Sequence, residues 1–160
     1  METDTEYLLS MKQEVKDKWV EALESGDYTQ GRSALHVVRT SDSEPDSELF
    51  CCLGVLSHLA FLAGAVTAGP SGRRYAAPGA VAYGLGRSTG YLPSEVIEWA
   101  GLRWHGENYN GYTSLADDED EPTRCLRFGH GLKDTLSMRN DSGDSFEQIA
   151  GLIRTRIKGV

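Results

Sequence analysis

This 160-residue sequence lacks any apolar run that matches the roughly 20 residues a helix needs to cross a bilayer. Its longest apolar run, residues 49–68, is interrupted by Ser57, His58 and two glycines. The first six residues are acidic and lack the basic segment that opens a secretory signal peptide. We therefore expect a protein of the bacterial cytoplasm with no membrane partner.

Cysteine is scarce, with only Cys51, Cys52 and Cys125 in the chain. An odd count without a secretion signal argues against a disulfide framework, and neighbouring cysteines rarely bond to each other, so all three are expected to be thiols. Zinc sites favour closely spaced ligand pairs. Cys52 precedes His58 by six positions and Cys125 precedes His130 by five, and neither spacing fits. We expect no metal site and no cofactor.

Positive charge is also in short supply. The formal net charge is −8, and residues 105–122 contain six acidic residues and no Lys or Arg. Duplex nucleic acid is bound mainly through Lys and Arg that neutralise phosphates, so this balance argues against it as a partner. It leaves room for a local basic site that holds a small anion. Acidic surfaces at 40–48 and 117–121 offer a different possibility, which is docking on a basic host protein.

The apolar patterning predicts a single α+β domain over residues 1–160, with about four helices on a small antiparallel sheet. We expect helices over 5–25, 53–63 and 93–100, a hairpin of strands at 34–39 and 49–52, short strands within 64–92, and mobile loops at 40–48 and 104–122. A C-terminal helix is expected to begin at Asp144, because Glu147 three residues later completes a capping-box pattern.

The segment from Phe50 to Ala60 is almost uncharged and is expected to lie at the centre of the fold. Cys51 or Cys52 at the start of a helix, with His36 or His58 as a base, would suit a small cysteine-dependent hydrolase. The alternative is that both cysteines are buried core residues, which is the commoner role of unpaired cysteine. The sequence favours the second interpretation.

A glycine-rich loop at 84–90 resembles a phosphate-binding loop only in its glycines, because it lacks the lysine of a Walker motif. Arginine forks bind phosphates and aromatic rings stack on bases. Arginines and tyrosines interleaved on such loops therefore favour a nucleotide-like ligand, and we expect polar residues after the first helix to contribute to the same site. The candidate ligand-binding residues are Arg73, Arg74, Tyr75, Tyr83, Arg87, Ser88, Thr89, Tyr91, Gln30 and Arg32. A solvated, glycine-rich turn is the alternative.

Several segments, in their order along the chain, resemble a family of small uncharacterised proteins of bacteriophages and prophages. They are residues 18–31, Ala34-Leu35, residues 50–56, Leu92-Pro93 with Val96 and residues 99–102, and Asn140 to Gly143 with Ser145 to Glu147 and Ile149-Ala150. The resemblance implies a phage accessory protein acting in the host cytoplasm, and it implies no activity. Segments 64–91 and 104–122 lie outside it.

Three functions follow as hypotheses. The first is a non-enzymatic counter-defence protein that binds and sequesters a small anionic, nucleotide-derived ligand. The second is an acidic protein–protein inhibitor of a host factor. The third is the cysteine-dependent hydrolase, for which no base and orienting acid are assigned. A homo-oligomer is compatible with each of them.

Overall fold

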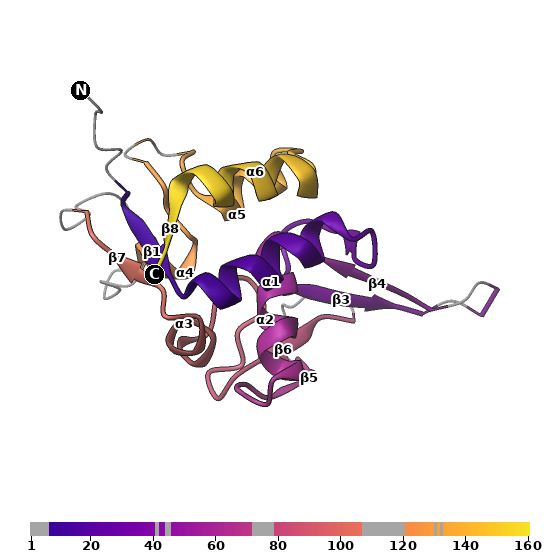
Figure 1. Ribbon diagram of the computed structural model, residues 1–160. Coiled ribbons are helices and arrows are strands. Elements are labelled where there is room, and N and C mark those ends of the chain that lie inside the picture. The colour runs from indigo at the N-terminus through magenta and orange to yellow at the C-terminus, as the bar shows by residue number, and fades with distance from the viewer. Residues whose placement is uncertain are drawn as a thin grey trace, which may run out of the picture.

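The computed structural model describes residues 7–40, 42–43, 46–71, 79–106, 121–129, 131 and 133–160, and its arrangement is mixed α+β, as expected (Figure 1). The elements are, in order, β1 (Leu9–Met11), α1 (Gln13–Glu24), β2 (Thr29–Gln30), β3 (His36–Arg39), β4 (Ser47–Phe50), α2 (Cys52–Leu62), β5 (Ala68–Pro70), β6 (Val81–Tyr83), α3 (Ser94–Ala100), β7 (Arg103–Trp104), α4 (Glu121–Arg124), α5 (Leu136–Asp141), α6 (Phe146–Arg156) and β8 (Ile157–Gly159).

The described strands form three small sheets. β1 lies between β7, to which it is antiparallel, and β8, to which it is parallel. The expected hairpin is present as β3 and β4, and β2 joins the outer edge of β4 in parallel. β5 and β6 form a separate antiparallel pair, and an isolated bridge between Val37 and Ala80 joins it to β3. Parallel pairing was not expected from sequence, because it joins segments far apart in the chain.

The first helix is shorter than the expected 5–25. It begins at Gln13, and Leu9–Met11 forms the central strand β1 with all three residues buried. Apolar residues at positions 8 and 11 fit a helical stripe, but they also fit a short buried strand. The outcome is decided by β7 and β8, which supply backbone partners on both edges of β1.

The C-terminal helix also begins one residue later than expected. Ser145, not Asp144, is the N-cap of α6, and Gln148 rather than Glu147 closes the capping box. The Ser145 hydroxyl accepts from the Gln148 amide at 3.2 Å, and the Gln148 side chain accepts from the Ser145 amide at 2.8 Å. Asp144 with Glu147 and Ser145 with Gln148 both fit the capping-box pattern. The start of the helix could therefore be predicted from the sequence only to within one residue.

A single hydrophobic cluster ties these elements together. Helix α2 lies at its centre with seven of its residues buried, and the fully buried side chains include Trp19, Leu53, Leu56, Ile149 and Ile153. Figure 1 shows α6 lying along α1, with α2 on the other side of α1. Within the described residues, no helix is both long enough and apolar enough to cross a membrane. Parts of the two expected mobile loops, at 41, 44–45 and 107–120, lie outside the described residues.

Candidate functional site

Asn140 is the centre of the polar network at the start of α2, and it is fully buried. Its side-chain oxygen accepts from the Cys52 backbone amide at 3.1 Å and from Gln30 Nε2 at 2.9 Å. Its side-chain nitrogen donates to the Gly31 carbonyl at 2.8 Å. Gln30 also donates to the Asp144 carbonyl at 2.7 Å. The Gln30 side chain, expected to bind a ligand, is therefore used inside the fold.

The segment that carries Cys51 and Cys52 packs closely against the backbone of Leu35. A Cβ added at Gly54 would lie 1.5 Å from the Leu35 carbonyl oxygen, so only glycine allows α2 to approach residue 35 this closely. The Cys51 amide donates to the same carbonyl at 3.2 Å, and Trp19 Nε1 donates to the Cys52 carbonyl at 3.0 Å. Four of the segments on which the family resemblance rests, at 18–31, 34–35, 50–56 and 140–143, therefore contact one another in the interior of the fold.

The structure places both adjacent thiols inside the core, in agreement with the favoured interpretation. Cys51 is 5% exposed and Cys52 is fully buried. Burial raises the pKa of Cys51 to about 12 and raises the pKa of Cys52 well above its ordinary value. A cysteine nucleophile needs the opposite setting, an accessible thiol with a lowered pKa. Neither thiol is suited to the hydrolase chemistry.

His36 lies in a chain of hydrogen bonds that runs from the core to the surface. Its Nε2 lies 3.0 Å from Glu48 Oε1, and its Nδ1 lies 2.8 Å from the Tyr83 hydroxyl. Because a carboxylate only accepts, Nε2 carries the hydrogen and Tyr83 donates to Nδ1. This order matches the hydroxyl–histidine–carboxylate order of a catalytic triad. Tyr83 is only 1% exposed, however, and burial raises its pKa, so no substrate reaches the hydroxyl.

Aromatic rings enclose this chain. His36 stacks on Phe50 at a centroid distance of 4.1 Å, and His58 packs edge-on against Phe50 at 5.4 Å and against Tyr28 at 5.8 Å. The rings contact one another, which leaves no cage between them for a cation. Burial lowers the pKa of both His36 and His58. The group is therefore best described as a packed aromatic cluster with two neutral imidazoles.

The glycine-rich segment after β6 forms a tight hairpin turn. Tyr83 and Ser88 exchange backbone hydrogen bonds at 2.9 and 3.0 Å, and Gly84 (φ +80°) and Arg87 (φ +53°) adopt left-handed conformations. The Arg87 side chain reaches back to β5, where Nη2 donates to the Pro70 carbonyl at 3.1 Å and to the Ser71 carbonyl at 3.2 Å. Its Nε and Nη1 donors have no partner among the described residues.

A groove of about 330 Å³ lies on the β5–β6 pair beside this turn; we call it the β5–β6 groove. Of the described residues that line it, Arg87 alone is charged, and the others are Thr67, Ala68, Gly69, Pro70, Ala82, Gly84 and Leu85. The lining is made of small residues apart from Leu85 and Arg87, and a Cβ added at Gly69 would meet nothing within 4 Å. Among the described residues, the groove therefore combines a lining of small, uncharged residues with guanidinium donors of Arg87 that make no bond within the fold.

The remaining predicted ligand-binding residues are not gathered around Arg87. Ser88 is buried and its hydroxyl donates to the Tyr91 carbonyl, while Tyr91 lies under the Arg124 guanidinium at 5.3 Å. The Thr89 carbonyl accepts from the Leu35 amide. Arg32 is exposed, on the side of the molecule near Gly143. Arg73, Arg74 and Tyr75 lie outside the described residues.

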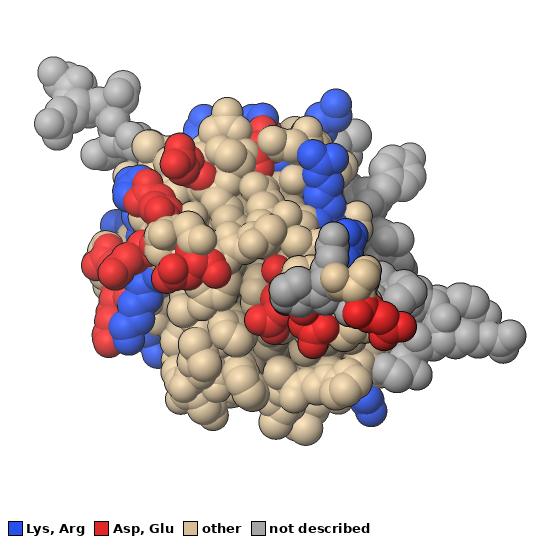
Figure 2. Space-filling view, turned by 90° about the vertical axis from the view of Figure 1, so that its right-hand side faces the viewer, with Lys and Arg blue, Asp and Glu red and all other residues tan. Residues whose placement is uncertain are grey.

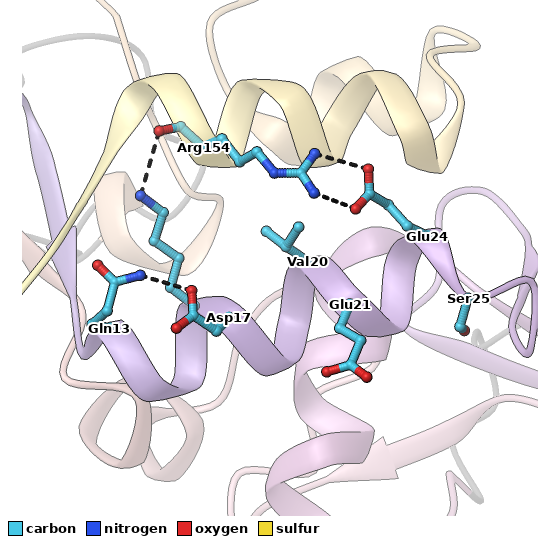
Figure 3. A pocket seen from close by; sticks show the side chains of 8 residues that line it. Gln13, Asp17, Val20, Glu21, Glu24, Ser25 and Arg154 are labelled. Atoms are coloured by element: carbon cyan, nitrogen blue, oxygen red, sulfur yellow. Dashed lines mark hydrogen bonds and ion pairs between the residues drawn. The ribbon is translucent and has the colours of Figure 1, made fainter.

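A second groove, of about 600 Å³, runs between α1 and α6; we call it the α1–α6 groove (Figure 3). Arg154 forms a two-pronged ion pair with Glu24 across it, and Lys16 Nζ donates to the Ile157 carbonyl at 2.5 Å. Arg154 lowers the pKa of Glu24 through this hydrogen bond, whereas burial lowers the pKa of Lys16. These charges bind the two helices to each other. Asp17 and Glu21 leave the lining acidic on the α1 side.

The comparisons with known proteins give one match. Residues 11–157 match the family model described as a domain of unknown function (DUF8296). The chain belongs to the DUF8296 family. No curated protein and no solved structure matches it. Within the described residues of this DUF8296 member, no group of three or more His, Cys, Asp or Glu side chains is placed to hold a metal ion.

Sequence reasoning missed two features of this DUF8296 chain. It did not link His36 to Tyr83 and Glu48, because a histidine in an apolar strand gives no sign of its partners. It also did not identify residues 67–70 as the opposite wall of the groove that Arg87 lines. The signal for that wall was present as the small-residue run from Ala63 to Gly69 without charge. Only the β5–β6 pairing shows which residues that run faces.

Proposed function

We propose that this protein is a phage accessory protein that binds and sequesters a small anionic, nucleotide-derived ligand in the host cytoplasm, and so blunts a host defence signal. The observation that carries the proposal is the β5–β6 groove, in which Arg87 is the one charged lining residue among those that the structure describes. The phage setting rests on the resemblance described above, whose segments lie within residues 18–150.

The chemistry of the groove supports an anion attached to a flat group. The Nε and Nη1 atoms of Arg87 keep hydrogen-bond donors for a phosphate or carboxylate, because the bonds to Pro70 and Ser71 use Nη2 alone. Ala68, Gly69 and Ala82 offer a surface on which a ring can lie without meeting a bulky side chain. The volume of about 330 Å³ is at the lower end of the range for small-molecule sites.

The state of the two core thiols and of His36 supports a protein that binds its ligand without converting it. The pKa values of Cys51 and Cys52 are raised by burial, and both ring nitrogens of His36 are committed to hydrogen bonds within the fold. A sequestering protein needs only affinity and abundance.

The first experiment is native mass spectrometry of the protein purified from bacterial cytosol, followed by identification of any molecule released by heat. A panel of mononucleotides, dinucleotides and cyclic nucleotides is then titrated into wild type and two variants. Arg87→Gln removes the charge, and Gly69→Val fills the floor while leaving Arg87 in place. Both should weaken binding at least tenfold, whereas Arg103→Gln, at an exposed arginine on β7, should bind as wild type does.

Two results would overturn the proposal. One is the absence of binding to every member of the panel at high micromolar concentration together with a ligand-free protein from the cytosol. The other is binding that Arg87→Gln and Gly69→Val leave unchanged. Thermal unfolding of each variant separates loss of the site from loss of the fold.

A second candidate function, an acidic inhibitor of a host protein, is favoured by the α1–α6 groove. Asp17 and Glu21 lie on its α1 side, and Glu21 has no partner among the described residues. A basic host protein should be captured in a salt-dependent way. Neutralising both groups with Asp17→Asn and Glu21→Gln should abolish capture, and Glu98→Gln on α3 serves as the control. Equal capture by all these proteins would remove this candidate.

A further inference from the structure

We infer that an acidic segment of a partner protein binds one side of the β7–β1–β8 sheet. The register of this sheet places Arg103 on β7 and Lys158 on β8 directly beside Ser10 of the central strand, one on each side of it. Residues that are paired across neighbouring strands point to the same side of a sheet, so these three side chains share one side. We call this side the basic sheet face.

Burial identifies the basic sheet face as the side of the sheet that meets solvent. Leu9 and Ile157, which pair with each other one position earlier on β1 and β8, are fully buried and belong to the hydrophobic core. Arg103 and Lys158 are exposed, as expected from the alternation of side chains along a strand. In Figure 1 the sheet lies at the left-hand end of the molecule, away from β3 and β4.

The strands of this sheet carry basic residues and no acidic ones. Residues 8–12, 102–105 and 156–160, which are the three strands with their flanking positions, contain four Lys or Arg and no Asp or Glu, although the chain has a formal net charge of −8. Figure 2 shows the end of the molecule away from this sheet, where Asp and Glu lie in groups beside Lys and Arg. Arg103 and Lys158 make no hydrogen bond or ion pair with the described residues, so both charges are available to a partner.

A hydrogen bond at the centre of the basic sheet face positions a further polar group. Ser10 Oγ lies 2.6 Å from Nε2 of His105, the exposed residue that follows β7. The His105 amide donates to the Leu8 carbonyl at 2.8 Å, which extends the pairing of β7 with β1. Nδ1 of the ring has no partner among the described residues, and it carries the hydrogen when Ser10 donates to Nε2. His105 then offers a hydrogen-bond donor on the same side of the sheet as the two cations.

The spacing of the two cations fits an extended acidic segment. Arg103 and Lys158 are anchored two strand spacings apart, which is about 10 Å, and each has a long, flexible side chain. In an extended chain, carboxylates two residues apart point to the same side and lie about 7 Å from each other. A segment that crosses the sheet can therefore bring one carboxylate to each cation. Charge complementarity of this kind selects an acidic partner and excludes basic ones.

The same features argue against a small anion or a nucleic acid as the occupant. An exposed ion pair contributes little by itself, so the partner must engage several groups at once. For this reason Arg103→Gln should leave the binding of nucleotides to the β5–β6 groove unchanged. Single-stranded nucleic acid is held largely by bases that stack on aromatic rings. Of the side chains placed on this face only His105 has a ring, and that ring is bonded to Ser10.

The test is fluorescence anisotropy with a labelled peptide of alternating aspartate and serine, at low and at physiological salt. Wild type should bind the peptide, with an affinity that falls as salt rises. Arg103→Gln combined with Lys158→Gln should weaken binding at least tenfold. The matched control, Lys18→Gln combined with Arg39→Gln, removes the same charge at exposed positions on α1 and β3 and should bind within twofold of wild type. The same peptide with asparagine in place of aspartate should not bind.

Four outcomes would overturn the inference. They are no binding of the acidic peptide by wild type at high micromolar concentration and low salt, an unchanged affinity in the double variant, an equal loss in the matched control, and equally tight binding of a single-stranded oligonucleotide of the same charge. Circular dichroism melting verifies that each variant is folded. The single variants Arg103→Gln and Lys158→Gln, each expected to weaken binding severalfold, replace the double variant if it does not fold. The nucleotide titration is a separate measurement, and its failure leaves this inference standing.

Discussion

Asn140 and Cys52 are 88 positions apart in the chain, yet the Asn140 side-chain oxygen lies 3.1 Å from the Cys52 backbone nitrogen. That amide opens the first turn of α2, where helix geometry leaves it without a backbone partner. Cys51, the N-cap residue, makes no side-chain capping bond. Asn140 therefore supplies, from α5, the cap that the local sequence of α2 lacks.

Asn140→Ala should destabilise the protein strongly. The substitution leaves the Cys52 amide, the Gln30 amide group and the Gly31 carbonyl short of a partner in a buried setting. Such groups cost roughly 1–3 kcal/mol each, and we expect a total loss of about 3 kcal/mol after relaxation. Urea unfolding measures it. Met138→Ala, at an exposed position of the same helix, should lose less than about 1 kcal/mol. Equal losses in the two variants would show that Asn140 is not the cap.

Gly54→Ala should prevent folding or cost more than about 4 kcal/mol, because the added Cβ meets the Leu35 carbonyl oxygen at 1.5 Å. Backbone on both sides of this contact leaves little room for adjustment. Gly151→Ala is the matched control, since Gly151 lies within α6 and an added Cβ there meets nothing within 4 Å. It should stabilise the protein by roughly 0.5–1 kcal/mol through helix propensity. Thermal unfolding of the pair separates the effect of the contact from that of the alanine.

The sequence predicted the local structure well where the residue pattern of a helix or hairpin depends only on that helix or hairpin. Helix α3 and its glycine stop, the β3–β4 hairpin and the buried α2 all follow from spacing and turn residues. It failed at β1, because Leu9 and its neighbours take their conformation from strands that pair with them from 95 and 148 positions away, as Leu9 does with Trp104 and Ile157. Local periodicity carries no information about such partners.

The candidate site was less predictable than the fold. Arg87 was selected for its charge within a glycine-rich loop, and it does line a groove. Tyr83 was selected by the same reasoning, but its hydroxyl bonds His36 in the core. Gln30 was selected as a polar loop residue, but its amide bonds Asn140. A polar side chain that binds a ligand and one that satisfies a buried partner look alike until the partner is located.

The thiols of Cys51 and Cys52 should resist alkylation in the native protein. Both are buried, and burial raises the pKa of Cys51 to about 12, so the reactive thiolate is scarce at pH 8. Iodoacetamide followed by peptide mass spectrometry should label Cys125, which is partly exposed, well before the other two. In urea all three should react at similar rates. Rapid native labelling of Cys51 or Cys52 would contradict the burial and restore the cysteine hydrolase as a candidate.

Stability should fall as pH drops from 7.5 toward 5, because burial lowers the pKa of His36 and His58 in the folded protein. The unfolded chain takes up protons near the ordinary histidine value of 6.5, whereas the folded chain takes them up only at lower pH. The unfolded state therefore binds more protons in this interval, and the free energy of unfolding decreases as pH falls through it. The stabilising contribution of the two neutral imidazoles is fully present well above pH 6.5. The decline in the free energy of unfolding ends once the pH is below the lowered pKa values of His36 and His58 in the folded protein.

His58→Phe isolates one of these two groups. The His58 ring packs against Tyr28, Phe50 and Phe61, and no hydrogen bond joins it to the described residues, so phenylalanine keeps the ring packing and removes the proton site. His36 keeps its partners Glu48 and Tyr83 in this variant. Urea unfolding at several pH values should give a shallower decline than in wild type, with the two proteins most alike in stability near pH 7.5. A decline of the same steepness in the variant would mean that His58 does not contribute, and the pH dependence would then be assigned to His36.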